Sequence, residues 1–265
     1  MIRYTNTLKG FAIQTTNGEL GHVDDFFFDD ERWTVRYLVI STGPLFLGRR
    51  LLISPAAVAQ VRRDDREVRL NLSSEQVRGS PDVDTHRPVS RQREVEMNAY
   101  YGWPDYWLGS GLWYNGMTPA AMLPVGRTRA QSAAARARRV GRSAVDRHLR
   151  SVNEVRGYHI RAEDGDLGHV EDFGVQDETW ALRYVIIDTR NWLPGKCVIL
   201  STAWVKRVDW GLRKLEIGLR MQQIRDAPEP PQGGAMDREF EIALHRHYQR
   251  QQYWLQSEKR SRSKS

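Results

Sequence analysis

Short segments in which apolar and polar residues alternate follow one another along the first eighty residues. Alternation with a period of two is typical of half-buried β-strands, and acidic or glycine-containing turns separate the segments. The pattern predicts strands at residues 10–16, 20–29, 33–41, 49–54, 58–62 and 67–72. Evenly spaced short strands of this kind indicate a small barrel or sandwich.

Two local features refine the first predicted hairpin. Asn17-Gly18 has the composition of a type I′ turn, as does Asp164-Gly165 later in the chain. Leu20 and Val23 are three positions apart in the second strand, and both are expected to face inward, which predicts a β-bulge at Gly21. Gly168 is the corresponding residue of the second hairpin.

An internal repeat sets the domain organisation. When the chain is shifted by 147 residues, NGELGHVDDFFFDDERWTVRYLVIST (from Asn17) lies on DGDLGHVEDFGVQDETWALRYVIIDT (from Asp164), with 14 of 26 positions identical. The alignment needs no gap and continues into SRQREVEMNAYYGWPDYW, which lies on DREFEIALHRHYQRQQYW. Each copy spans about 100 residues, which is long enough to bury its own core.

A segment of different composition follows each copy. Residues 90–101 and 237–250 are rich in helix-forming residues, and Ser73 with Gln76 predicts a capped helical turn. We therefore expect a mainly β fold: two small antiparallel β-barrels in tandem, each followed by a short helix and joined by a basic, partly helical linker. The expected ranges are 7–83 for the first barrel, 84–107 for its helical and aromatic extension, 108–150 for the linker, 154–230 for the second barrel, 231–256 for its extension and 257–265 for a basic disordered tail.

The net charge is concentrated in two segments. The chain carries +7, but residues 127–150 alone carry +7 and residues 257–265 carry +3, which leaves the remainder at −3. The barrels are therefore not expected to offer a basic surface to nucleic acid. Cys197 has no partner for an internal disulfide, and the apolar runs are shorter than a membrane span. Because the N-terminus also lacks the pattern of a secretory signal, we expect a cytoplasmic protein with no transmembrane segment.

The repeated run resembles a known domain family. The run is similar to the PRC-barrel pattern: it reads G-x-L-G-H-V-x-D-F, then an acidic turn, then W-x-x-R-Y before a hydrophobic run. The similarity covers residues 7–80 and 154–227. The resemblance implies a small, mostly antiparallel β-barrel that serves in binding and scaffolding rather than catalysis. The residues of the repeated signature, expected to be structural, are Gly18, Gly21, His22, Asp25, Trp33, Arg36, Tyr37, Gly165, Gly168, His169, Asp172, Trp180, Arg183 and Tyr184.

The same family includes the cytoplasmic barrel of the photosynthetic reaction centre H subunit and the C-terminal domain of the small-subunit ribosome maturation factor. The first has an N-terminal transmembrane helix and the second a different N-terminal domain, and we expect neither here. The shared role that the resemblance implies is protein–protein scaffolding. One alternative is electron or proton transfer at the periphery of a membrane complex, and a second is RNA or ribosome association through the Arg-rich linker.

Candidate partner contacts are apolar loop residues and aromatic residues of the first extension. The loops at 43–48 and 191–195 occupy equivalent positions and are expected either to close an open barrel end or to contact a partner. Residues 100–114 hold seven aromatic residues, of which Tyr101 and Trp107 have repeat equivalents and are expected to cover their own barrel. The candidate contacts are Leu45, Phe46, Leu47, Trp113, Tyr114, Trp192 and Leu193.

The Arg-rich linker is the candidate for electrostatic contact. A stretch rich in arginine binds phosphates of nucleic acid or of an anionic membrane surface, although a solvated spacer is the favoured interpretation. The residues concerned are Arg136, Arg138, Arg139 and Arg142.

Two repeated side-chain types have both a structural and a functional interpretation. His22 and His169 are expected to be exposed beside compensating acids, with a proton relay or a metal pair as the alternative. Arg36 and Arg183 are expected on the surface beside core-facing aromatics, with a cation–π or partner contact as the alternative.

The sequence contains no motif for catalysis. It lacks Gly-x-Ser-x-Gly, a Gly-rich phosphate loop and metal-ligand spacing, and its carboxylates are scattered along turns. We expect no enzymatic activity and no catalytic, metal-binding or cofactor-binding residue. The expected partner is another protein, and self-association is an open alternative.

Overall fold

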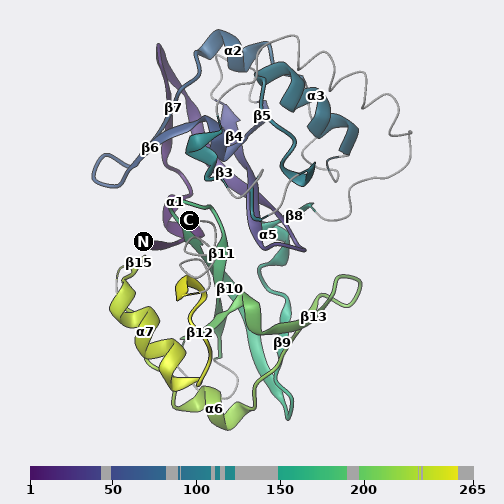
Figure 1. Ribbon diagram of the computed structural model, residues 1–265, viewed down its shortest axis with the longest axis vertical. Helices are drawn as coiled ribbons and strands as arrows, with labels where there is room; N and C mark the ends of the chain where they lie inside the picture. Colours follow the sequence, from purple (N-terminus) through teal and green to yellow (C-terminus); the bar gives the residue numbers. More distant parts are fainter. Residues whose placement is uncertain are drawn as a thin grey trace, which may run out of the picture. The chain divides into compact units, whose positions relative to one another are not determined.

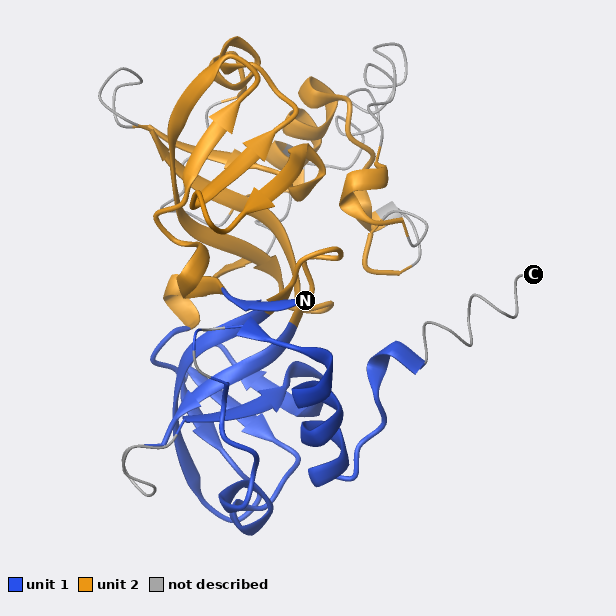
Figure 2. Ribbon diagram, turned by 90° about the vertical axis from the view of Figure 1, so that its left-hand side faces the viewer, with its two compact units in different colours: residues 1–4, 156–174, 183–265 blue, residues 5–155, 175–182 orange. Residues whose placement is uncertain are grey.

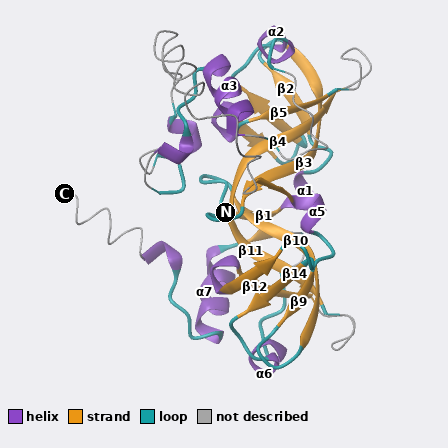
Figure 3. Cartoon of the chain, turned by 90° about the vertical axis from the view of Figure 1, so that its right-hand side faces the viewer, coloured by secondary structure: helices purple, strands orange, loops and turns teal. Residues whose placement is uncertain are grey.

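The computed structural model describes residues 1–42, 49–81, 89, 91–108, 111–113, 117–122, 149–189, 197–231, 233 and 235–255. This part of the chain is mainly β, with two sheets and short helices (Figure 3). Within it, the helices are all too short or too polar to cross a membrane.

The chain divides into two compact units that interleave along the sequence (Figure 2). Unit 1 comprises Met1–Tyr4, Arg156–Gly174 and Arg183–Ser265. Unit 2 comprises Thr5–Val155 and Val175–Leu182.

The described strands of the two units follow the same order in their sheets. In unit 2 the order is β5 (Arg50–Ile53), β4 (Thr34–Thr42), β3 (Gly18–Asp29), β2 (Ala12–Thr15), β7 (Glu67–Leu70) and β6 (Val58–Arg62). The other sheet has β12 (Cys197–Ser201), β11 (Leu182–Asp188), β10 (Asp166–Gln176), β9 (His159–Arg161), β14 (Lys214–Ile217) and β13 (Val205–Asp209). Most neighbours are antiparallel, as expected, but β2/β7 and β9/β14 are parallel.

Short helices connect and flank the strands (Figure 1). The α-helices are α1 (Thr5–Leu8), α2 (Ser74–Arg78), α3 (Arg91–Tyr101), α5 (Val152–Val155), α6 (Met221–Arg225) and α7 (Arg238–His247). The 3-10 turns are η2 (Pro55–Ala57), η3 (Tyr106–Leu108), η5 (Pro119–Ala121) and η6 (Thr202–Trp204). The predicted cap of α2 is confirmed, because Ser73 and Gln76 form a reciprocal capping box.

The predicted bulges are present in both copies. The register of β2 against β3 shifts beside Gly21, and that of β9 against β10 shifts beside Gly168. Leu20 and Val23 are both buried, as expected from the extra residue. A Cβ atom at Gly21 would collide with the Ser41 carbonyl oxygen, so the close approach of the neighbouring strand requires glycine here.

The predicted type I′ turns are wrong in position. Thr15 pairs with Gly18, so the turn residues are Thr16 and Asn17, and neither has the positive φ that a type I′ turn requires. The Asn17 side chain serves another purpose: its Oδ1 accepts a hydrogen bond of 2.9 Å from the backbone N–H of Ser74 at the start of α2. In the second copy, Asp164 Oδ1 accepts one of 2.8 Å from the N–H of Met221.

The first residues of each repeat copy lie in the unit formed mainly by the other copy. β8 (Leu149–Ser151) pairs with β3 in unit 2, with Ser151 opposite Phe27. β1 (Ile2–Tyr4) belongs to unit 1, where it pairs with β10 and β15 (Ala235–Met236). Ile2 and Leu149 are 147 positions apart, the repeat interval, so the exchange is reciprocal. The sequence predicted neither strand, because each is only three residues long.

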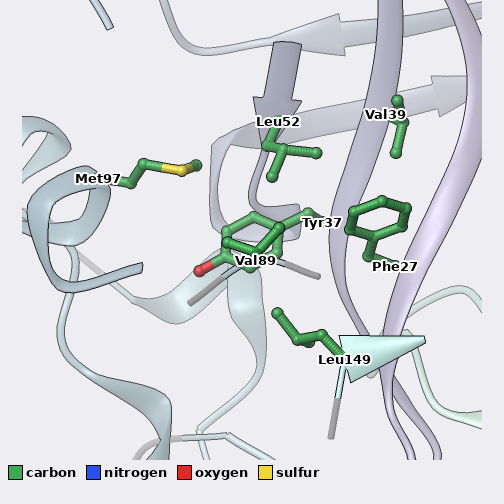
Figure 4. Close-up of a cluster of buried hydrophobic side chains, with 7 residues drawn as sticks. All are labelled: Phe27, Tyr37, Val39, Leu52, Val89, Met97 and Leu149. Carbon is green, nitrogen blue, oxygen red and sulfur yellow. The ribbon is translucent and has the colours of Figure 1, made fainter. Parts of the chain in front are cut away.

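Side chains on the exchanged strands enter the cores. Figure 4 shows Leu149 beside Tyr37 and Phe27 in a cluster of unit 2. The other members of that cluster are Val39, Leu52, Val89 and Met97. In unit 1 the repeat partner of Phe27 is Gly174, where an added Cβ would lie 2.8 Å from both Ile2 Cγ2 and Met236 Cε. Ile2 and Met236 therefore fill the space next to Gly174, and a larger side chain at position 174 would clash with them.

We expect Ile2→Ala to destabilise unit 1, although residue 2 is at the start of the first copy. Ile2 is 1 % exposed, and truncating a buried Ile typically costs about 2–5 kcal/mol. Hydrogen exchange measured by mass spectrometry should show reduced protection in residues 156–174 and 183–255, with residues 5–122 protected as before.

Leu149→Ala is the reciprocal control, because Leu149 is 6 % exposed and lies in unit 2. It should reduce protection in residues 5–122 instead. The reciprocal placement of β1 and β8 is contradicted if Ile2→Ala reduces protection in residues 5–122 and Leu149→Ala reduces it in residues 156–174 and 183–255.

Candidate functional site

A buried glutamate joins the first extension to its sheet. Glu94 on α3 is fully buried, and its Oε1 accepts hydrogen bonds from the hydroxyls of Tyr37 (3.0 Å) and Tyr106 (2.8 Å). Arg91, one helical turn earlier, places Nη1 3.0 Å from Glu94 Oε2. Tyr37 comes from the middle of β4 and Tyr106 from η3, so the carboxylate connects sheet, helix and aromatic segment.

The same arrangement recurs in the second copy at the repeat interval. Glu241 on α7 accepts from the hydroxyls of Tyr184 (2.9 Å) and Tyr253 (2.8 Å), and Arg238 lies 3.0 Å from its other oxygen. We call these two constellations, Arg91–Glu94–Tyr37–Tyr106 and Arg238–Glu241–Tyr184–Tyr253, the tyrosine–glutamate latches.

Electrostatics keep the phenols protonated. Burial, together with the negative charge of Glu94, raises the pKa of Tyr37 and of Tyr106 well above the ordinary value of 10. Burial and Glu241 raise the pKa of Tyr184 in the same direction. Each phenol therefore acts as a hydrogen-bond donor to a carboxylate that an arginine also pairs, and these ionisable groups satisfy one another.

Arg36 is buried rather than exposed, which corrects the expectation of a surface arginine. It is 1 % exposed, and its guanidinium lies 3.9 Å from the ring centre of Tyr106 and 4.8 Å from that of Trp113. Its Nη2 is 3.1 Å from Asp29 Oδ2. The cation–π alternative is thus observed, and Arg183 shows it too, at 4.1 Å from the ring of Tyr253.

Trp113 is 1 % exposed, unlike the surface contact that the sequence predicted. Its indole Nε1 donates a 2.7 Å hydrogen bond to the Thr179 carbonyl oxygen, and its ring covers Arg36. A tryptophan without a repeat equivalent is therefore used to bury a cation inside unit 2. Tyr101 is buried and stacks on Trp103 at 4.3 Å, and Trp107 covers Arg91 of α3 at 4.0 Å.

The predicted histidine sites remain separate from the latches. His22 is exposed and His169 is partly buried, with its ring centre 4.4 Å from that of His159. The acids expected to compensate His22 have other partners: Asp24 pairs with Arg50 at 2.7 Å, and Asp25 accepts from Ser151 and from the N–H of Asn153. Across the described ranges, no group of three or more His, Cys, Asp and Glu side chains could hold a metal ion.

The two copies differ at one buried position beside the latch. In the first, Asn98 donates to Asp105 at 3.0 Å. In the second, His245 occupies this position, 2 % exposed, with Nε2 3.2 Å from the Tyr184 hydroxyl. Because that hydroxyl donates to Glu241, we assign Nε2 as the donor to it. The ring centre of Trp204 lies 5.4 Å from that of His245.

A hollow of about 310 Å³ lies beside α3 in unit 2. Aromatic and amide side chains line much of it, and burial raises the pKa of one lining phenol, Tyr101, to about 12. The lining residues are Ala56, Asn71, Leu72, Gln76, Tyr100, Tyr101, Trp103 and Met122. In this described lining there is no carboxylate, histidine, thiol, lysine or arginine, so the hollow suits an uncharged group that can stack on aromatic rings and bond amides.

Most of the predicted contact residues lie outside the described residues and stay predictions. These are Leu45, Phe46, Leu47, Tyr114, Trp192 and Leu193, together with the linker residues Arg136, Arg138, Arg139 and Arg142.

The latch glutamates were missed by sequence reasoning, although the repeat alignment contained the signal. In the aligned extensions the identical pairs include Arg91/Arg238, Glu94/Glu241, Tyr106/Tyr253 and Trp107/Trp254.

We expect Tyr106→Phe to loosen the extension of unit 2 and Tyr253→Phe to loosen that of unit 1. Each change removes a hydrogen bond to a buried carboxylate, a loss of about 1.5–3 kcal/mol. Hydrogen exchange of α3 and α7 would report each effect. Tyr100→Phe is the matched control, because Tyr100 is 44 % exposed and its hydroxyl donates to the Gln76 carbonyl oxygen, not to a buried carboxylate. Equal effects of all three changes would contradict the latch.

We expect unit 1 to lose stability as the pH falls below about 6.5, the ordinary pKa of histidine. Burial lowers the pKa of His245, so the unfolded chain takes up this proton at a higher pH than the folded chain does. The loss should therefore begin near the unfolded value and level off below the folded one.

His245→Asn introduces the residue that the first copy has at this position and should remove this part of the pH dependence. Urea unfolding of both proteins at pH 7.5 and 5.5 measures it. An unchanged difference between the two pH values would contradict the assignment.

The comparison with protein families gives one match. Residues 2–77 match the family model described as PRC-barrel domain. No curated protein matches the chain. The matched range begins at β1 and ends within α2, so it covers the first copy of the repeat. The resemblance predicted from the turn and core pattern is confirmed for this copy: residues 2–77 of the chain are similar to the PRC-barrel domain.

Proposed function

We propose that this chain is a non-enzymatic protein-interaction protein that uses both repeat copies as scaffolding modules. PRC-barrel domains are generally non-catalytic, and the domain at residues 2–77 suggests an interaction module.

The observation that carries the proposal is the chemical character of the hollow beside α3. Its described lining offers aromatic faces and amides but no group for acid–base or nucleophilic chemistry. The buried carboxylate of Glu94 is already engaged, because two phenols donate to its Oε1 and Arg91 forms an ion pair with its Oε2. A volume of about 310 Å³ accepts one or two large side chains of a partner.

The apolar loop residues add a second contact in this proposal. Residues 43–48 join β4 to β5, and residues 190–196 join β11 to β12 at the equivalent place. Phe46 and Trp192 are the large aromatic members and the best candidates for interface anchors.

Affinity capture from native lysate tests the proposal. The baits are the full chain, a chain lacking residues 127–147, and Asn71→Trp, which fills the hollow from an exposed lining position. Gln60→Trp adds the same aromatic at another exposed position outside the lining.

We expect one protein to be retained by the full chain, by the deletion and by Gln60→Trp at both low and moderate salt. Asn71→Trp should reduce its affinity at least about tenfold, since anchor residues in pockets dominate interface energies. Loss of all capture with the deletion or with salt would show electrostatic binding to nucleic acid or membrane and refute the scaffold.

A further inference from the structure

The β13–β14 hairpin of unit 1 ends in an exposed apolar turn. Leu212 at its tip is 73 % exposed, the highest value among the large hydrophobic side chains of the described residues. The turn is well formed, because Asp209 Oδ1 accepts a 2.9 Å hydrogen bond from the Leu212 N–H. Trp210 in the same turn is partly exposed, with its ring centre 6.1 Å from that of Tyr158.

Basic side chains flank this turn on both strands. Residues 206–214 (KRVDWGLRK) contain four basic residues and one acid, a net charge of +3. Arg207 lies 3.5 Å from Asp209 but keeps 68 % of its side chain exposed, and Lys206 pairs with Glu163 while remaining 60 % exposed. Arg213 is exposed beside them. Glu163, the partner of Lys206, and Glu216, opposite Arg207 in the hairpin, offset part of this charge, and a smaller net positive charge is presented to solvent around the apolar tip.

The equivalent hairpin of the first copy has the opposite character. Residues 59–67 (AQVRRDDRE) contain three arginines and three acids, and its turn carries Asp64-Asp65 where the second copy has Gly211-Leu212. Arg62 pairs with Asp65 at 2.6 Å, so the charges of that turn are compensated locally. Because both turns close the same kind of hairpin, the apolar tip is not required by the fold.

We propose that the β13–β14 tip docks on an anionic lipid bilayer, with Leu212 and Trp210 entering the boundary between headgroups and acyl chains. Tryptophan is favoured at this boundary, and lysine and arginine near it gain from the negative surface potential. Stable attachment to a membrane needs two signals, and the tip supplies an apolar and a basic one. Nucleic acid fits less well, because an exposed leucine gains nothing against phosphates.

This surface is separate from the hollow of unit 2, so the inference goes beyond the proposed function and does not depend on it. A bilayer contact would add a place of attachment to a protein whose modules bind another protein.

Co-sedimentation of the purified full chain with vesicles tests the inference. Vesicles of phosphatidylcholine alone are compared with vesicles containing about 30 mol % phosphatidylserine, which carry the negative surface potential that attracts basic residues. We expect binding to the anionic vesicles, a reduction of about tenfold or more in Leu212→Asp, and retention in a chain lacking residues 127–147.

The charge is tested with matched pairs. Arg207→Gln with Lys214→Gln should weaken binding several-fold and lessen its dependence on salt. Arg63→Gln with Arg69→Gln, which removes two exposed arginines from the first copy's hairpin region, should leave binding unchanged.

Insertion itself is read from an environment-sensitive fluorophore. In a Cys197→Ser background, a label at Leu212→Cys should shift to the blue on anionic vesicles, whereas a label at the equivalent Asp65→Cys should not. The inference is overturned by absence of binding to anionic vesicles, by binding that Leu212→Asp leaves intact, by binding lost with residues 127–147, or by a label that stays in water. Binding of single-stranded RNA that competes with vesicles and is insensitive to Leu212→Asp would overturn it in favour of nucleic acid.

Discussion

A carboxylate taken out of water loses several kcal/mol of solvation unless hydrogen bonds and a counter-charge replace the lost water. Glu94 and Glu241 meet that demand with two tyrosine hydroxyls and an arginine each. Since one tyrosine comes from the centre of the sheet and the other from the segment after the helix, the carboxylate is satisfied only when all three parts are assembled. The position of each extension on its sheet depends on this requirement.

The buried arginine adds a second constraint in unit 2. Arg36 needs Asp29, the ring of Tyr106 and the ring of Trp113 to replace its water. Tyr106 serves both Glu94 and Arg36, so it couples a buried anion to a buried cation. Burial of polar groups of this kind favours a single arrangement, because alternatives leave a charge without partners.

The sequence was informative where a pattern extends over many residues. Alternation identified β3, β4 and β6 closely, and the spacing of Leu20 and Val23 identified the bulge. The sequence was misleading at Asn17, which accepts a hydrogen bond from the Ser74 N–H at the start of α2 instead of taking a positive φ in a type I′ turn. The sequence did not predict β1 or β8, because three residues are too few to show an alternation of apolar and polar positions. Part of each latch could have been predicted, because Arg91, Glu94, Tyr106 and Trp107 are identical in the aligned extensions. Their contact with Tyr37 could not, because it depends on the tertiary structure.

The reciprocal placement of β1 and β8 also governs the order in which the chain can assemble during synthesis. Ile2–Tyr4 are translated well before their partner β10, which begins only at residue 166. The sheet of the first copy is made early but lacks β8 until residue 151, and its contacts with residues 175–182 come later still. Contacts between residues far apart in sequence slow folding. Unit 2 therefore cannot be completed before residues 175–182 are translated, and β1 has no sheet to join before β10 is translated. Until then the nascent chain must keep incomplete sheets in solution.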